Sequence, residues 1–158
     1  MPDAPKRIDT DSARAHLDRA LDDHEQAFER FFLARFLDLS FTYLPEGAPD
    51  AEKTTCRITF PVTDMVRNPQ GSLHGGVMCS AMDISMGHLV AKVAGPGATI
   101  EMKVQFIRPV MEGNVTVEGS FTRRGRSLSF MESKLYSGDG KLAAHATATW
   151  KMPTRPEP

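Results

Sequence analysis

The sequence predicts an α+β fold in which an antiparallel sheet wraps around one long helix. A segment with helical periodicity runs from Gly75 to near Ala94, about 20 residues or roughly 30 Å. The sequence after it alternates apolar and polar residues in stretches separated by turns, which predicts consecutive antiparallel strands. Because one helix has to cover the whole sheet, we expect the sheet to curl around it.

One domain with an N-terminal extension accounts for the 158 residues, of which 41% are hydrophobic. We divide the chain into an extension at 1–38, a domain at 39–152 and a disordered tail at 153–158. The extension is expected to be one amphipathic helix, capped by Asp11 or Ser12, that docks on the domain or on another subunit. Its histidines, His16 and His24, are expected to be solvated. The apolar residues at helical spacing are Leu17, Leu21, Phe28, Phe32 and Phe36.

Strands are expected at 39–44, 53–62, 100–106, 115–121, 127–136 and 142–150. Gly95-Pro96-Gly97 ends the long helix, and the Ser-Gly-Asp-Gly run at 137–140 predicts a hairpin turn. The alternation breaks near Met131, which predicts a bulge. Each strand after the helix should have one covered face, which in the first of them carries Ile100, Met102, Val104 and Phe106.

The long helix has an apolar face and a face of small residues. The small face carries one carboxylate, Asp83, which close approach of a ligand or another backbone would bury. The apolar face is formed by Val77, Met78, Ala81, Met82, Ser85 and Leu89, and the small face by Gly76, Ser80, Asp83 and Gly87. Asp83 is therefore a candidate functional residue.

The start of this helix predicts an oxyanion site. Free N–H groups of the first turn polarise a carbonyl, and the glycines Gly75 and Gly76 keep side chains out of its way. Gly75 and Asp83 are eight residues apart, about 12 Å along the axis, whereas attack on a bound carbonyl needs contacts of about 3 Å. If they cooperate, Asp83 must come from a second copy, so the sequence predicts an obligate symmetric dimer.

The run Asn68, His74-Gly75-Gly76 and Asp83, followed by ATIEMKVQFIRPV at 98–110, resembles the hotdog-fold thioesterases and, within them, the phenylacetate-type (PaaI-like) acyl-CoA thioesterases. The resemblance covers about residues 39 to 152. It implies a hotdog fold and an acyl-CoA substrate, with the Gly75 N–H on the thioester carbonyl and Asp83 of the opposite subunit as general base or nucleophile. It further implies that Asn68 and His74 help to hold the carbonyl or the water, and that Thr99 supplies a hydroxyl.

Several alternatives stay open. Asn68 could initiate a turn or hold a water, and His74 could only orient the loop. Asp83 could act as a base or form an anhydride with the acyl group. The chain as a whole could instead be a non-catalytic acyl-CoA-binding module, or a hotdog enoyl-CoA hydratase, whose Asp-x-Asn-Pro run is matched here only by Asn68-Pro69.

Charge and composition limit the partners. A net charge of −1 gives no general attraction to nucleic acid, and no stretch reaches the roughly 18 to 20 consecutive apolar residues that span a bilayer. Two cysteines outside a CxxC pattern argue against structural zinc, and neither a metal nor a cofactor is implied. We expect a cytoplasmic homodimer, with two dimers pairing into a tetramer. The arginines Arg108, Arg123, Arg124 and Arg126 could bind the phosphates of CoA as a cluster.

Overall fold

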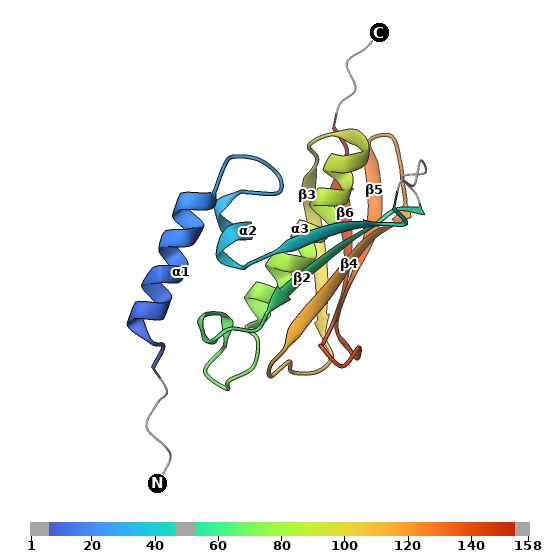
Figure 1. Cartoon of the computed structure of the whole chain (residues 1–158). Helices are drawn as coiled ribbons and strands as arrows, with labels where there is room; N and C mark the ends of the chain where they lie inside the picture. Colours follow the sequence, from blue (N-terminus) through green and yellow to red (C-terminus); the bar gives the residue numbers. More distant parts are fainter. Residues whose placement is uncertain (1–6, 47–52, 154–158) are drawn as a thin grey trace.

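The structure, a computed structural model, describes residues 7–46 and 53–153. Figure 1 shows a curved sheet whose strands wrap one side of a long helix, α3, while the N-terminal helices stand on the other side. The elements are α1 (Thr10–Asp23), α2 (Phe32–Phe36), β1 (Ser40–Leu44), β2 (Thr55–Pro61), a short 3-10 turn (Asp64–Val66), α3 (Gly75–Ala94), β3 (Ala98–Phe106), β4 (Asn114–Arg123), β5 (Leu128–Tyr136) and β6 (Leu142–Lys151).

The sheet has the order β1-β2-β4-β5-β6-β3, and all its neighbouring strands are antiparallel. The hotdog fold and the expected strands are therefore confirmed, although parts of the predicted turn at 45–50 and of the tail at 153–158 lie outside the described residues. The irregularity expected near Met131 lies in the facing strand, where the register shifts between Phe121 and Arg123. The sheet edges are β1 and β3, so β3 carries one unpaired edge.

The predicted apolar face of α3 packs into the concave side of the sheet. Close contact depends on Gly119 of β4, because a Cβ there would lie 2.6 Å from Ser85 Oγ and 2.7 Å from the Ser85 carbonyl carbon. By length and composition alone α3 could cross a membrane, but its apolar side lies in the protein core. The largest fully buried core side chains include Phe60, Ile58, Met82, Met86, Leu89, Met131, Leu135, Val115 and Val117.

The prediction of a single N-terminal helix is wrong. The helix is interrupted, because α1 ends at Asp23 and α2 begins only at Phe32. Arg30 turns back and donates to the backbone oxygen of Asp23 at 3.1 Å, which closes the intervening segment. The helix cap is Asp9, which accepts from the Ser12 N–H at 2.8 Å, and so lies ahead of both expected caps.

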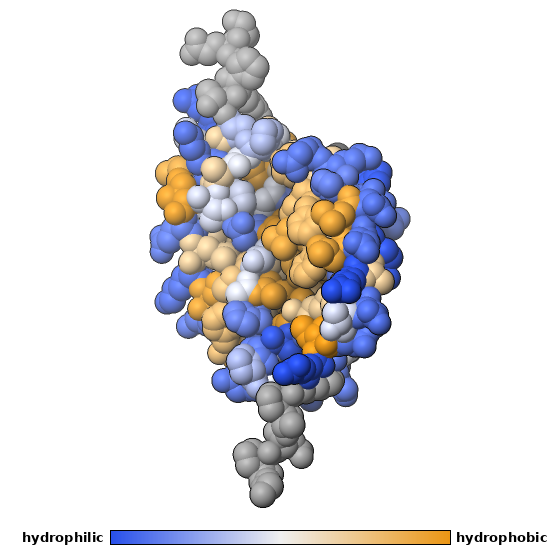
Figure 2. Space-filling model, turned by 90° about the vertical axis from the view of Figure 1, so that its left-hand side faces the viewer, coloured by the Kyte–Doolittle hydropathy of each residue, from blue (hydrophilic) through white to orange (hydrophobic). Residues whose placement is uncertain are grey.

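His16 is also placed differently from the prediction. Its ring is buried because α1 packs on α2, and its Nε2 lies 2.6 Å from the backbone oxygen of Phe36. His24 is exposed, as expected. Figure 2 shows the side of the molecule that carries α1, where apolar surface lies in patches among hydrophilic residues. The exposed apolar residues of the extension include Leu17, Leu21, Phe28 and Leu33.

The apolar face predicted for strand β3 is only partly buried. Met102 and Val104 are half-buried, while Ile100 and Phe106 are 57% and 55% exposed. Ile100 falls at a register shift between Thr99 and Glu101, so it leaves the alternation that predicted its burial. An edge strand with unpaired backbone groups and exposed apolar side chains is a surface that invites a further strand.

Candidate active site

The loop that leads into α3 is closed by Asn68. Its Oδ1 accepts from the N–H groups of Gln70 and Ser72 at 3.0 and 3.1 Å, and its Nδ2 donates to the Ser72 hydroxyl at 2.9 Å. Because the carboxamide is occupied within its own loop, its geometry favours the turn-forming alternative over a water-holding one. Asn68 therefore fixes the path of the chain into the helix.

His74 caps α3 and leaves one N–H free. Its Nδ1 accepts from the Gly76 N–H at 2.9 Å, and its backbone oxygen accepts from Val77 and Met78. The Gly75 N–H has no acceptor among the described residues. The helix start thus presents a single free backbone donor, on the residue that the sequence resemblance assigns to the carbonyl, and it lies at the positive end of the helix dipole.

The ring of Phe106 stands against this donor. A Cβ on Gly75 would lie 3.2 Å from Phe106 Cζ, so glycine lets the ring approach the helix start. Sequence reasoning did not single out Phe106 as a site residue. Its position in the sequence could have indicated this role. Phe106 shares a strand face with Met102 and Val104, and it ends a strand that returns antiparallel to the helix, toward the helix start.

Asp83 lies on the side of α3 that the sheet leaves open. The Thr99 hydroxyl donates to Asp83 Oδ1 at 2.7 Å, and Oδ2 has no hydrogen-bond partner among the described residues. The structure thus joins the helix carboxylate to the hydroxyl that was expected on the following strand. Within one chain Gly75 remains two turns from Asp83, about 12 Å by helix geometry.

The four arginines do not form one cluster within a chain. Arg108 follows β3 near the start of α3, whereas Arg123, Arg124 and Arg126 lie at the β4–β5 hairpin near the helix end. Arg124 donates to the backbone oxygen of Val93 at 3.4 Å and so contacts the C-terminal turn of α3.

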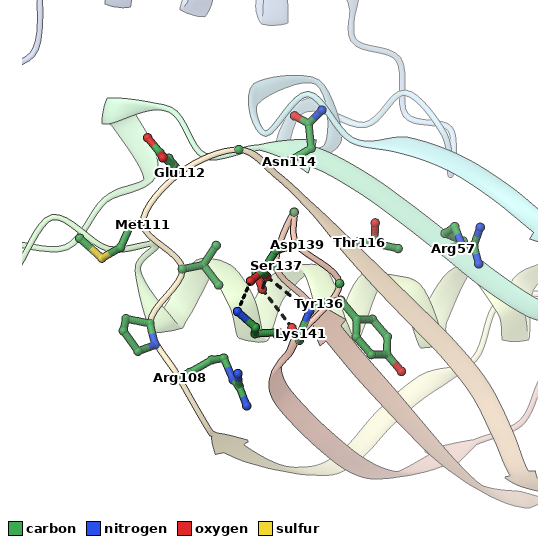
Figure 3. A pocket seen from close by; sticks show the side chains of 15 residues that line it. Arg57, Arg108, Met111, Glu112, Asn114, Thr116, Tyr136, Ser137, Asp139 and Lys141 are labelled. Carbon is green, nitrogen blue, oxygen red and sulfur yellow. Dashed lines mark hydrogen bonds and ion pairs between the residues drawn. The ribbon is translucent and has the colours of Figure 1, made fainter.

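Arg108 lines a hollow of about 1120 Å³ on the outer side of the sheet. Figure 3 shows Arg108 and Arg57 on separate sides of this hollow, contributed by the segment after β3 and by β2. Arg57 pairs with Glu118 at 2.6 Å and Lys141 with Asp139 at 2.6 Å, but the Arg108 guanidinium has no ion pair among the described residues. No three His, Cys, Asp or Glu side chains in the described ranges gather to hold a metal ion.

Comparison with known proteins places this arrangement in a family. The model of the thioesterase superfamily matches residues 70–144, which contain the helix start, Asp83 and Thr99. The chain is 31% identical over 132 residues to a Saccharolobus solfataricus protein named "Putative esterase SSO2140", with 82% of this chain and 93% of that one covered. It is 29% identical over 100 residues to the medium/long-chain acyl-CoA thioesterase YigI of Salmonella typhimurium, covering 52% and 64% of the two chains.

Solved structures agree in fold. A Bacillus halodurans protein, BH2602, determined with CoA, matches with a TM-score of 0.74 at 19% identity, over 89% of this chain and 88% of that one. The E. coli PaaI protein of the phenylacetic acid degradation operon matches with a TM-score of 0.71 at 17% identity, over 88% and 96%. The chain belongs to the hotdog-fold thioesterase superfamily, and hydrolysis of thioesters is the activity that this membership supports.

Proposed function

We propose that the protein hydrolyses acyl-CoA thioesters as a two-fold dimer, with each active site shared between the copies. The observation that carries the proposal is that α3 carries two unused groups: the Gly75 N–H and the Asp83 oxygen that does not accept from Thr99. The Gly75 N–H can donate to a developing oxyanion, and the Asp83 oxygen can accept a proton. Two comparisons support the substrate class: one relative is named an acyl-CoA thioesterase, and one structural neighbour was determined with CoA.

The proposed reaction begins with the thioester carbonyl oxygen on the Gly75 N–H. Asp83 Oδ2 of the partner accepts a proton from water as the water oxygen attacks the carbonyl carbon, and the Thr99 hydroxyl holds Oδ1 in place. The tetrahedral intermediate then expels the CoA sulfur, which takes up the proton, and the free acid forms. Gly75 stabilises the charge that develops on oxygen, a contribution that grows in the transition state.

The edge of β3 is the surface through which we propose that the copies meet. Pairing of the two β3 strands would bury Ile100 and continue the sheet, with the α3 helices antiparallel and their open faces toward each other. The start of each helix would then approach Asp83 of the other. The same symmetry would bring Arg108 of one copy toward the partner's β4–β5 hairpin, so the CoA phosphates would meet arginines from both chains. A tetramer and a cytoplasmic location remain predictions.

The decisive test is Asp83→Asn, with turnover measured on benzoyl-, phenylacetyl- and fatty-acyl-CoA thioesters. We expect kcat to fall by about 10²-fold or more, because the amide cannot accept the proton, while the dimer survives in size-exclusion chromatography. Asp18→Asn is the matched control, since Asp18 is an exposed carboxylate on α1, outside the hollow that Arg108 lines. Unchanged turnover in Asp83→Asn would remove this carboxylate from the reaction, and tight binding without turnover by the unaltered protein would favour a non-catalytic acyl-CoA module.

A further inference from the structure

The hollow that Arg108 lines adjoins the start of α3, although it opens on the outer side of the sheet. Val110 forms part of its wall, and the Val110 oxygen accepts from the Leu73 N–H at 2.8 Å. Arg108 follows Phe106, whose ring stands against Gly75, by two residues, which span at most about 7 Å. The segment that carries Arg108 therefore separates the hollow from the free Gly75 N–H.

The walls of this hollow are held in place by hydrogen bonds. Arg67 donates to the backbone oxygens of Gly71 and Met111, and so ties the segment after β3 to the loop before α3. The other wall is the hairpin between β5 and β6, where the Ser137 N–H donates to the Lys141 oxygen at 3.0 Å. A site whose walls are ordered before a ligand arrives loses less conformational entropy when it binds.

One cation in the hollow is unmatched. The other two cationic side chains there, Arg57 and Lys141, each pair with a carboxylate at 2.6 Å, whereas Arg108 has no ion pair among the described residues. Figure 3 shows the Arg108 guanidinium and the Glu112 carboxylate at opposite ends of the loop after β3. A free guanidinium holds phosphate oxygens with two parallel hydrogen bonds, so this end of the hollow suits a phosphate group.

A second feature of the hollow is an aromatic ring on a different strand. Tyr136 ends β5 and is half-buried, and Figure 3 shows its ring in the hollow, with Thr116 and Arg57 farther along the sheet. A nucleobase stacks on such a ring whatever its sequence identity. The volume of about 1120 Å³ is slightly above the roughly 300 to 1,000 Å³ of small-molecule pockets, so the hollow can hold far more than one phosphate.

We propose that this hollow binds the nucleotide of CoA, with a phosphate on Arg108 and the adenine against the ring of Tyr136. This inference rests on the proposed function, because it places the nucleotide beside the proposed carbonyl site. Phe106 and Ile107, which are 55% and 49% exposed, offer apolar surface between the two sites for the pantetheine arm. The protein then prefers CoA thioesters to thioesters that lack the nucleotide.

The first test measures the binding of adenosine 3′,5′-bisphosphate by isothermal titration calorimetry. This ligand carries no thioester, so its binding does not depend on the carbonyl site. We expect Arg108→Gln to raise its Kd by about tenfold or more and Tyr136→Ala by about fivefold or more, while Tyr136→Phe, which keeps the ring, binds like the unaltered protein. Arg14→Gln is the control for charge, since Arg14 is exposed on α1.

The second test is kinetic and compares the best acyl-CoA substrate with the same acyl group on N-acetylcysteamine, which has no nucleotide. Tyr136→Ala should raise KM for the CoA thioester by about fivefold or more and leave kcat and the smaller substrate unchanged. Phe130→Ala is the matched control, because Phe130 is an exposed ring on the same face of β5 that does not line the hollow.

The outcomes separate the two proposals. The same Kd for the bisphosphate in the unaltered protein, Arg108→Gln and Tyr136→Ala would overturn the nucleotide site, as would absence of binding to the unaltered protein. An equal rise of KM on both thioesters would make the role of Tyr136 structural and would also overturn it. Binding that depends on Arg108 and Tyr136, in a protein that hydrolyses no acyl-CoA, would uphold the nucleotide site and refute the proposed function.

Discussion

Replacing Gly75 with proline removes the N–H donor and puts the ring Cδ in the direction from which a carbonyl oxygen would approach the nitrogen. Gly75 is the first residue of α3, a position where proline is favoured because its fixed φ suits the helix and the N–H bonds nothing inside it. The preceding residue, His74, has ψ 131°, within the range that a following proline requires. The fold should therefore accept the substitution, and any loss of activity reports on the carbonyl site at this nitrogen.

The expected loss follows from the role we assign to that N–H. Removing one oxyanion donor lowers kcat by about 10² to 10³, equivalent to about 2.7 to 4 kcal/mol of transition-state stabilisation. The new ring also reaches Phe106, whose Cζ would lie 3.2 Å from an added Cβ. Gly75→Ala supplies the same Cβ but keeps the N–H, so it separates the effect of the Cβ from that of the changed nitrogen. Phe106 is 55% exposed and can move aside, which predicts a much smaller change for alanine.

The assay is steady-state release of CoA, with circular dichroism and chromatography to verify the fold and dimer. Mixing Gly75→Pro chains with Asp83→Asn chains adds a second measurement. A hybrid dimer would have one site with both intact groups and one with neither, so it should recover up to half of the unaltered activity. Full activity in Gly75→Pro, or hybrids as inactive as their parents, would refute a site shared between copies.

Three further predictions concern assembly, packing and acid stability. Ile100→Lys places a charge on the exposed edge of β3 and should convert dimers to inactive monomers in analytical ultracentrifugation. Leu128→Lys should not, because Leu128, which is 47% exposed against 57% for Ile100, lies on β5 away from that edge. Gly119→Ala forces a Cβ to within 2.7 Å of the Ser85 carbonyl carbon and should lower the free energy of unfolding in urea by about 1 to 3 kcal/mol; an unchanged midpoint would contradict this packing. His88 has a lowered pKa in the fold, so below its ordinary value of about 6.5 the unfolded chain binds a proton that the fold excludes, and stability falls. His88→Phe should lose less stability than the unaltered protein as the pH drops below that value, as measured by thermal unfolding.

The sequence revealed α3 and its two faces because both depend on local periodicity. Val77 to Leu89 repeat at helical spacing over several turns, and no other element has to be known to recognise the pattern. Asp83 and Thr99 could be matched for the same reason, since a single turn joins the helix to the strand that follows it.

The errors come from contacts between distant segments. Phe28, Phe32 and Phe36 continue the period of α1, yet Phe28 packs against His88 instead of prolonging the helix. His16 is buried where α1 packs on α2, and a backbone oxygen twenty residues away accepts its hydrogen bond. Neither partner leaves a local pattern in the sequence, so the break in the extension and the burial of His16 appear only when the tertiary structure is known.

The strand that supplies Thr99 and ends beside Gly75 also forms one edge of the sheet, where its outer side has no neighbouring strand among the described residues. If the two copies meet there, dissociation separates the Gly75 N–H of every site from the partner's Asp83. A single chain then has no complete active site. Specific activity should then follow mass action, falling on dilution with the same midpoint as the dissociation of the dimer and returning when the enzyme is concentrated again.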